Sequence, residues 1–423
     1  MDISFVISTR NNLKYLKWSY DSIRKNQGNH TVWLCYGLDA CNDGTKEWIQ
    51  KIQETDSEVV FIENDTDTRV GHTIMYDRII NELVETDLAM IFHSDMYLCE
   101  GALDAIEKTM HKRVMPGIQF DADDIVPIGI IRNKRCIVSL TRIEPPLHPA
   151  GKEKIVVDFG TEPENFDENK LLEYTKGQIW RYIRDHGNPN LNPTNGVFAP
   201  WAFWVDEFKE IGGHDPLFAP QSKEDSDIFN RFQLNRTEFL QTWKGFVYHL
   251  TCRGSRFAPS LTTPGTNSQE WENQNIKSSR NFIRKWGHFV QHDEYLNPII
   301  PHKYDIMFVV KNCTSNLLYN LEPWCDNMST DLNRHIVDRY IEFEQLNTKI
   351  DLYKKFFNYS RLPDIIVQID GYRLTDDDWN NIQNLSEIIT NSCDGPGEYE
   401  LGNLKLNVRE LKHYEQDLIV CKN

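Results

Sequence analysis

Short apolar runs alternate with longer amphipathic stretches along the first hundred residues of the chain. Short apolar runs are typical of buried strands, and apolar positions three and four residues apart are typical of helices. The pattern predicts strands at 3–8, 32–36, 59–62 and 88–92, separated by helices at 13–25, 46–53 and 73–83. Such regular alternation favours an α/β fold, in which helices pack on the faces of a parallel sheet.

The pattern changes in residues 116–200, which are rich in Pro, Gly and Asn. Only the stretch at about 168–185 has a helical pattern there. Long irregular segments inside a compact domain are more often functional than filler. We therefore expect 116–200 to be an insert on the acceptor side of one domain, which would span residues 1–295.

A second pattern of strands and helices follows the proline-containing linker at 298–301. Its elements are expected at 306–310, 334–357, 365–369 and 376–389. We expect residues 303–423 to form a small α/β domain of unknown role, which serves either homo-oligomerisation or docking to an acceptor or partner. This segment has neither the Cys/His spacing of a metal site nor the basic stripe of a nucleic-acid module.

Composition narrows the classes of partner. The 423 residues include 63 acidic and 46 basic side chains, which gives a formal net charge of −17 and argues against a nucleic-acid partner. The nine cysteines form no C-x-x-C pair, which favours reduced thiols and a cytoplasmic location. No apolar stretch reaches the roughly 20 residues of a membrane helix, so the sequence predicts a soluble protein without a transmembrane segment.

Polar residues follow the strand predicted at 88–92, at the sheet edge where open α/β folds bind ligands. They are His93, Ser94 and Asp95. Alternation along a strand would place His93 and Asp95 on the same side. Carboxylates suit hard divalent cations, and an imidazole suits manganese better than magnesium. The segment is a candidate metal site, and Asp95 is an equally good candidate for a helix cap.

Two earlier strand ends also carry polar residues. Thr9 and Arg10 could present backbone N–H groups and side chains to a ligand, or they could precede an ordinary helix cap. Asp39, in the segment 39–45, could accept the N–H of a nucleobase, or it could belong to a turn rich in Asp, Asn and Gly.

Two later segments are further candidates. Glu224, Asp225 and Asp227 are crowded acids, so the pKa of one of them could rise to suit a general base, or all three could stabilise a helix N-terminus. His249 ends an apolar run and could be a metal ligand, although a lone His is more often structural. The nearby Arg253 and Arg256 could bind phosphates.

The order of these motifs resembles glycosyltransferase family 2, the inverting nucleotide-sugar transferases of the GT-A type, over about residues 1–290. Segments 8–11, 39–45 and 92–96 stand where that family has its first strand-end turn, its D-G-S-T-D-G-T segment and its D-x-D motif. Gly212-Gly213-His214-Asp215 with Glu224-Asp225, His249 with Ser255, and Lys285-Trp286-Gly287 resemble its later motifs. The implied fold is a GT-A-type, Rossmann-like, mostly parallel sheet flanked by helices, followed by the small C-terminal domain.

The resemblance implies roles for the matched residues. A nucleotide-diphosphate sugar would be the donor, and the residues implied to contact it are Thr9, Arg10, Asp39, Ser94, Arg253, Ser255 and Arg256. A divalent metal (Mn or Mg) would be held by Asp95 and His249, with His93 in place of the first Asp of D-x-D. Asp225 would take the proton from an acceptor hydroxyl of a glycan or glycoconjugate, and Glu224 would contact or steer that acceptor.

Two other functions remain open. His93 in place of an Asp favours a catalytically weakened carbohydrate- or nucleotide-sugar-binding protein on the same scaffold, whereas Glu224-Asp225 and His249 favour the enzyme. A nucleotidyltransferase would have a Gly-rich loop after the first strand, and residues 8–13 contain no glycine. The aromatic residues that could stack on a sugar are Trp180, Trp201, Phe203 and Trp204, of which at least two are expected in the core.

Overall fold

The computed structural model describes residues 1–64, 66–114, 129–186, 193–253, 267–358 and 361–421. Contacts divide the chain into two compact units. Unit 1 comprises Met1–His214, Asn235–Trp271 and His292–Asn297, and unit 2 comprises Asp215–Leu234, Glu272–Gln291 and Pro298–Asn423. This division differs from the expected boundary near residue 295, because two segments that precede it in the sequence pack with the C-terminal part.

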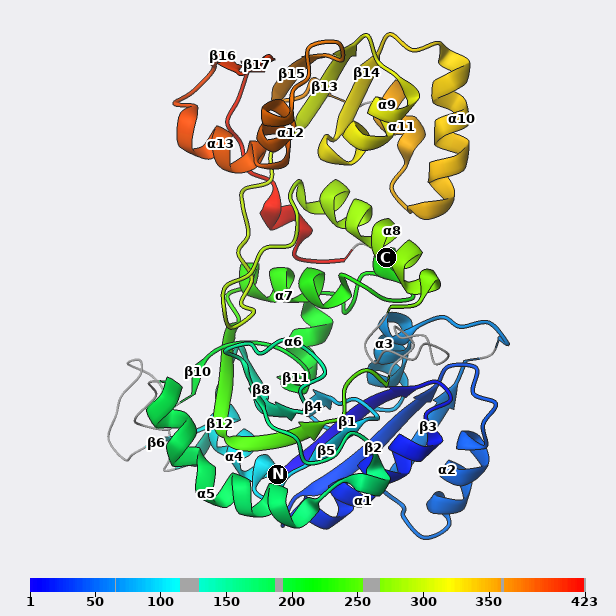
Figure 1. Cartoon of the computed structure of the whole chain (residues 1–423), viewed down its shortest axis with the longest axis vertical. Coiled ribbons are helices and arrows are strands. Elements are labelled where there is room, and N and C mark those ends of the chain that lie inside the picture. The colour runs from blue at the N-terminus through cyan, green and yellow to red at the C-terminus, as the bar shows by residue number, and fades with distance from the viewer. Residues whose placement is uncertain (65, 115–128, 187–192, 254–266, 359–360, 422–423) are drawn as a thin grey trace. The chain divides into compact units, whose positions relative to one another are not determined.

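Unit 1 is built on a ten-stranded sheet in the order β10-β12-β8-β11-β4-β1-β2-β3, with β5 paired to β12 and β9 paired to β8 (Figure 1). Its first strands are β1 (Asp2–Thr9), β2 (Thr31–Leu38), β3 (Val59–Glu63) and β4 (Leu88–Ile91), all parallel. The helices between them are α1 (Leu13–Asn26), α2 (Thr45–Gln53) and α3 (His72–Glu82). The predicted helix-flanked α/β fold is thereby confirmed, and the element bounds agree closely with the sequence pattern.

The other strands of the sheet come from later in the chain. They are β5 (Met96–Leu98), β8 (Cys136–Glu144), β9 (Lys154–Val156), β10 (Thr194–Asn195), β11 (Trp201–Trp204) and β12 (Glu238–His249). Strand β11 runs antiparallel to both β4 and β8, and β8 runs parallel to β12. It follows that β1, β2, β4, β8 and β12 all point the same way, so their carboxyl ends share one edge of the sheet.

The described part of 116–200 is far more regular than expected. Strand β8 lies inside the sheet and is buried along most of its length, and its polar side chains are satisfied within the core. Ser139 accepts the Phe198 N–H at 3.0 Å, and Thr141 donates to the Thr242 carbonyl at 2.9 Å. These polar positions interrupt the apolar run, and this interruption hid the strand from a hydrophobicity pattern.

The aromatic residues near this segment belong to the core. Trp201, Phe203 and Trp204 form most of β11 and are at most 4% exposed. The core interpretation is therefore confirmed for these three, while the side chain of Trp180 lies outside those described. The remaining described elements of unit 1 are α4 (Ala102–Met110), β6 (His111–Val114), β7 (Gly129–Arg132), η1 (Pro163–Asn165), α5 (Glu168–His186) and α6 (Val205–Glu210).

Unit 2 has a five-stranded sheet of its own, in the order β14-β13-β15-β17-β16 (Figure 1). The strands are β13 (Ile306–Lys311), β14 (Asn327–Thr330), β15 (Ile365–Asp370), β16 (Gly397–Leu401) and β17 (Leu404–Val408). Two helices from before residue 295 also contribute to this unit, namely α7 (Glu224–Leu234) and most of α8 (Gln269–Trp286). The second α/β domain expected from the sequence is thus present with additional elements.

The other helical elements of unit 2 are η2 (Pro216–Phe218), α9 (Ser315–Leu321), η3 (Glu322–Trp324), α10 (Arg334–Glu344), η4 (Gln345–Asn347), α11 (Leu352–Phe357), α12 (Asp376–Gln383), α13 (Leu385–Ser392) and η5 (Glu415–Leu418). The single helices expected at 334–357 and at 376–389 are therefore each divided into shorter ones. The acidic cluster 376–378 opens α12, where Thr375 and Asp378 form a capping box.

A buried ion cluster joins the helices of unit 2. Glu322 and Glu344 face Arg280, Arg284 and Lys355, and we call these five residues the Glu322 cluster. Arg284 Nη2 lies 2.6 Å from Glu322, and Lys355 Nζ lies 2.9 Å from it. Arg280 Nε lies 2.8 Å from Glu344, which also bonds Arg284. Burial raises the pKa of Glu322, but Lys355 and Arg284 outweigh burial and hold the pKa far below its ordinary value.

Two further features bear on the expected setting of the chain. Six of the nine cysteines are buried, as the dispersed pattern predicts, and none of the nine takes part in a disulfide in this structure. No helix within the described ranges has both the length and the apolar character needed to cross a membrane.

Candidate metal centre

A tight turn brings the first candidate ligands together. Strand β4 ends at Ile91, and the Met96 N–H donates to the His93 carbonyl at 3.2 Å, so residues 93–96 form a turn. The strand alternation expected for His93 and Asp95 is therefore wrong. After the turn, β5 runs antiparallel to β12 with Met96 opposite His249. This pairing, rather than alternation along one strand, is what places Asp95 beside His249.

His93, Asp95 and His249, which we call the unit 1 triad, each offer one ligand atom, and these atoms all lie within 4.8 Å of one another. His249 Nε2 is 3.4 Å from Asp95 Oδ1, and the imidazole rings of His93 and His249 meet edge to face with centroids 5.8 Å apart. Two ligand atoms at about 2.0–2.2 Å from one tetrahedral ion lie roughly 3.3–3.6 Å apart, which is close to the separation of His249 Nε2 and Asp95 Oδ1. Two imidazoles and a carboxylate at these distances suit a divalent transition ion, and they are the three residues predicted from the sequence as candidate ligands.

Glu144 is a member of the site that the sequence did not reveal. Strands β8 and β12 are parallel with Ile143 opposite Tyr248, so Glu144 and His249 emerge side by side. Glu144 is 2% exposed, and its Oε1 lies 2.8 Å from His249 Nδ1. A carboxylate in this position fixes the orientation of a ligating imidazole and increases its basicity. The bond leaves Nε2 of His249 directed at Asp95.

The charges of the site are strongly coupled. Burial lowers the pKa of His249, but Asp95 and Glu144 outweigh burial and raise it to about 9. Burial, together with the neighbouring His249, lowers the pKa of His93 to about 4. Burial raises the pKa of Asp95, but His249 outweighs burial and brings this pKa below its ordinary value. At neutral pH a proton on His249 thus balances two carboxylates, and a metal cation at Asp95 would take over that role.

Glu144 is balanced by two basic side chains. Arg142 Nη1 lies 3.3 Å from the Glu144 carboxylate, and Lys154 Nζ lies 2.8 Å from it. Burial raises the pKa of Glu144, but Arg142 and His249 lower it well below its ordinary range. Glu144 therefore stays ionised and available to His249 across the physiological pH range.

The ends of β1 and β2 supply the residues expected to contact a nucleoside. The Asp39 N–H donates to the Thr9 carbonyl at 3.0 Å, so the two strand ends are joined. Asp39 is 2% exposed, and its carboxylate accepts bonds of 2.8–2.9 Å from Asn64 Nδ2, Val70 N and Gly71 N. The hydroxyl of Thr9 is buried and has no hydrogen-bond partner among the described residues. Asp39 thus anchors the segment before α3, and Thr9 Oγ1 remains available to a ligand.

The other residues expected near the donor differ in their surroundings. Ser94 is 6% exposed and accepts a bond of 3.4 Å from Asn12, whereas Arg10 is exposed. Arg253 points to Glu162, with Nη2 2.9 Å from its carboxylate, so this guanidinium is already paired within the chain. Ser255 and Arg256 lie outside the described residues.

The acidic segment 224–227 begins helix α7 of unit 2. Glu224 is 7% exposed and Asp225 is exposed, whereas Asp227 is fully buried. Arg231 Nε lies 2.8 Å from Asp227, and Lys285 Nζ lies 2.6 Å from it. Burial raises the pKa of Asp227, but Lys285 and Arg231 lower it below the ordinary value. Asp227 is therefore a structural anchor and has the opposite shift from that expected of a general base.

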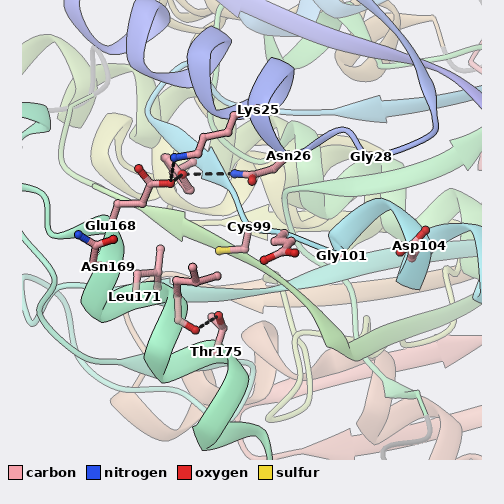
Figure 2. A pocket seen from close by; sticks show the side chains of 13 residues that line it. Lys25, Asn26, Gly28, Cys99, Gly101, Asp104, Glu168, Asn169, Leu171 and Thr175 are labelled. Carbon is pink, nitrogen blue, oxygen red and sulfur yellow. Dashed lines mark hydrogen bonds and ion pairs between the residues drawn. The ribbon is translucent and has the colours of Figure 1, made fainter.

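A cavity of about 500 Å³ lies elsewhere in unit 1, among the end of α1, the start of α4 and helix α5 (Figure 2). Lys25 Nζ and Tyr97 Oη both lie 2.5 Å from Glu168 Oε1, and Asn26 bonds Tyr97 Oη at 3.2 Å. The polar groups of this wall are thus paired with one another. None of the residues that line the cavity belongs to the predicted site.

No protein-family model and no curated protein sequence matches the chain. Solved structures that resemble it include GalNAc-T7 with UDP, GalNAc and Mn²⁺, at a TM-score of 0.44 and 11% identity over 67% of this chain and 48% of that one. Another is the mannosyltransferase PcManGT from Pyrobaculum calidifontis in complex with GDP-Man and Mn²⁺, at a TM-score of 0.39 and 11% identity over 67% and 63%. The matched region is therefore less than two thirds of either solved chain.

Proposed function

We propose that this chain is a glycosyltransferase that moves a sugar from a nucleotide-diphosphate sugar to a hydroxyl of a glycan or glycoconjugate, with inversion at the anomeric carbon. The observation that carries the proposal is the unit 1 triad, backed by Glu144. These residues end or follow strands β8, β12 and β4, whose carboxyl ends share one edge of the sheet with the ends of β1 and β2. That edge is where open α/β sheets bind their ligands.

The residues of this edge divide into two groups in the proposal. Asp95 and His249 hold the metal with His93 as a third ligand, and Glu144 orients His249. Thr9 and Asp39 line the nucleoside side, where the buried Thr9 hydroxyl is open to a new hydrogen bond. A bound divalent ion would neutralise the diphosphate and so stabilise the departing nucleotide.

The acceptor chemistry is assigned to the exposed acid of α7. In an inverting transfer, the acceptor oxygen forms a bond to the anomeric carbon while the bond from that carbon to the diphosphate oxygen breaks. Asp225 would take the proton of the acceptor hydroxyl, and Glu224 would steer the acceptor. Asp225 suits this role better than Asp227, because Asp227 is fully buried and already paired with two cations.

Donor binding is the first test. Thermal unfolding is followed with a panel of nucleotide diphosphates and nucleotide sugars, with and without manganese. One nucleotide should raise the melting temperature only when manganese is present, because binding to the folded chain alone adds about 2.7 kcal/mol to the free energy of unfolding at a ligand concentration of 100 times Kd. The increase should be lost in His249→Gln and kept in His292→Gln, since His292 is an exposed His of the same unit. The proposal is wrong if no nucleotide shifts the wild-type chain.

Transfer itself is the second test, and it separates the enzyme from a binding protein. Asp225→Asn should abolish release of the nucleotide diphosphate while it keeps the nucleotide-dependent thermal shift. The matched control is Asp377→Asn, because Asp377 is also an exposed acid in the first turn of a unit 2 helix. If the wild-type chain binds the donor but neither transfers nor hydrolyses it, the catalytically weakened nucleotide-sugar-binding protein is the correct interpretation.

A further inference from the structure

A second group of histidine and carboxylate ligands lies in unit 2, outside the site described above. His302, His413 and Glu415 each offer one ligand atom, and these atoms lie within 4.8 Å of one another. His302 precedes β13, whereas the other two residues follow β17 near the C-terminal end of the chain. His302 is far from His413 in the sequence and lies just before residues 303–423, so no local spacing of that segment indicates the site.

The two chain segments that carry these ligands are held together by backbone bonds. The Tyr414 N–H donates to the Lys303 carbonyl at 2.8 Å, and the Lys303 N–H donates to Glu415 Oε2 at 3.1 Å. Glu415 Oε1 lies 3.0 Å from His302 Nδ1. The carboxylate is largely buried, with 11% of its side chain exposed, so it is fixed in place without any ligand.

We propose that His302, His413 and Glu415 form a binding site for a divalent transition-metal ion of the Zn²⁺ class. Two ligands at about 2.0–2.1 Å from a tetrahedral zinc ion lie roughly 3.3 Å apart, close to the observed separation of His302 Nδ1 and Glu415 Oε1. Three protein ligands leave a fourth position for water. His302 has 40% of its side chain exposed and His413 is exposed, so an ion reaches the site from solvent.

The geometry of the two imidazoles indicates what binding would change. Their rings are stacked with centroids 3.7 Å apart and an angle of 20° between the planes, and Tyr304 meets the His413 ring edge-on. A nitrogen lone pair lies in the plane of its ring, so both imidazoles bind one ion only after a ring turns out of the stack. His413 is the exposed ring, so its rotation gives up the contact with Tyr304 and turns the ring into solvent.

The ligand atoms of the proposed site determine which metal ion it prefers. Imidazole nitrogen is a ligand of zinc, nickel and copper, whereas magnesium and calcium require mostly oxygen ligands. A single carboxylate beside two imidazoles therefore discriminates against magnesium. The ion would link the start of β13 to the segment after β17, and because those segments come together only in the folded unit, its binding stabilises the fold.

The experiment uses the full chain, stripped of metal with a chelator and then titrated with Zn²⁺ by calorimetry and followed by thermal unfolding. Wild type should bind zinc at the unit 2 site, and the ion should raise its melting temperature, whereas Mg²⁺ should give no response there. The variant His302→Gln/His413→Gln should lose one equivalent of zinc. The matched control is His292→Gln/His335→Gln, which replaces two exposed histidines elsewhere and should bind as wild type does.

Two further variants keep the result unambiguous. Asp95→Asn/His249→Gln removes ligands of the unit 1 triad and should retain one equivalent of zinc. This variant therefore tests the unit 2 site independently of the proposed glycosyltransferase function. Glu415→Gln keeps an oxygen that can accept the Lys303 N–H, and it should weaken zinc binding at least tenfold while circular dichroism stays unchanged. The proposal is overturned if His302→Gln/His413→Gln binds zinc with the stoichiometry and affinity of wild type.

Discussion

Two buried charge networks in this chain differ in the basic groups that neutralise their carboxylates. In the Glu322 cluster of unit 2, two acids are enclosed by two arginines and a lysine, so the chain itself completes the network. In the unit 1 triad, the described residues bring no arginine or lysine within ion-pair distance of Asp95, which faces imidazole instead. The comparison teaches that a buried carboxylate completed by fixed cations is scaffold, whereas one that faces exchangeable protons is a candidate site.

The chemistry of the basic partners explains the difference. Arginine and lysine remain charged throughout the physiological range, so their partners cannot be removed without leaving a buried charge. Histidine holds its proton less tightly than either of them, and a metal ion can replace that proton at the same nitrogen. The unit 1 triad can therefore exchange its cation, and the Glu322 cluster cannot.

Removing a carboxylate should have its largest effect on stability in the Glu322 cluster. Glu322→Gln keeps the shape of the side chain but leaves Arg284 and Lys355 buried without a counter-charge. We expect the free energy of unfolding to fall by about 3–5 kcal/mol in a denaturant titration. Glu342→Gln, an exposed change on helix α10, should alter it by less than about 0.5 kcal/mol. Equal effects of the two substitutions would show that the cluster is not structural.

The corresponding change in the unit 1 triad should cost binding rather than stability. Asp95→Asn should weaken manganese binding by more than about a hundredfold, which is about 2.8 kcal/mol, in a calorimetric titration. Its free energy of unfolding should fall by only about 1 kcal/mol, because His249 can release its proton when Asp95 no longer carries a charge. The control is Asp87→Asn. Asp87 is exposed and precedes strand β4, which Asp95 follows, so this substitution should leave both quantities unchanged. A loss of stability as large as that of Glu322→Gln would contradict the distinction between the clusters.

Glu144 tests whether the triad needs an orienting carboxylate. Glu144→Gln should weaken manganese binding by about tenfold to a hundredfold, because His249 keeps a hydrogen-bond partner but loses the negative charge that makes it basic. The same titration applies, with Glu238→Gln at the exposed start of strand β12 as the control. Unchanged affinity in Glu144→Gln would mean that the position of His249 is set by packing alone.

The unit 1 half of this comparison could be predicted from the sequence, because its signals are local. The apolar runs of β1 to β4 and the polar residues that follow them are features of single short segments, so His93, Asp95 and His249 could each be recognised as strand-end ligands. Strand β8 was missed because Ser139 and Thr141 interrupt its apolar run.

The missed parts of the site depend on pairing between distant segments. Glu144 becomes a partner of His249 only because β8 pairs with β12, and no local pattern specifies that pairing. Arg253 illustrates the same limit in the other direction, since its pairing with Glu162 could not be inferred from its neighbours. The Glu322 cluster also joins segments far apart in the chain, so no local pattern specifies it.

The smallest effect that we expect is a change at low pH in the contribution of Glu322 to stability. The folded pKa of Glu322 lies below its unfolded value of about 4.5, so its contribution to stability is complete above pH 4.5 and is lost as the pH falls through the folded pKa. The difference in unfolding free energy between wild type and Glu322→Gln should therefore stay constant from pH 7 to pH 5. Below pH 4.5 it should shrink by at most about 1.4 kcal/mol per pH unit, since one group takes up one proton. A difference that stays constant down to about pH 3 would mean that the pKa of Glu322 is the same in the folded and unfolded chains. Packing of the Glu322 side chain, rather than its charge, would then account for the lower stability of Glu322→Gln.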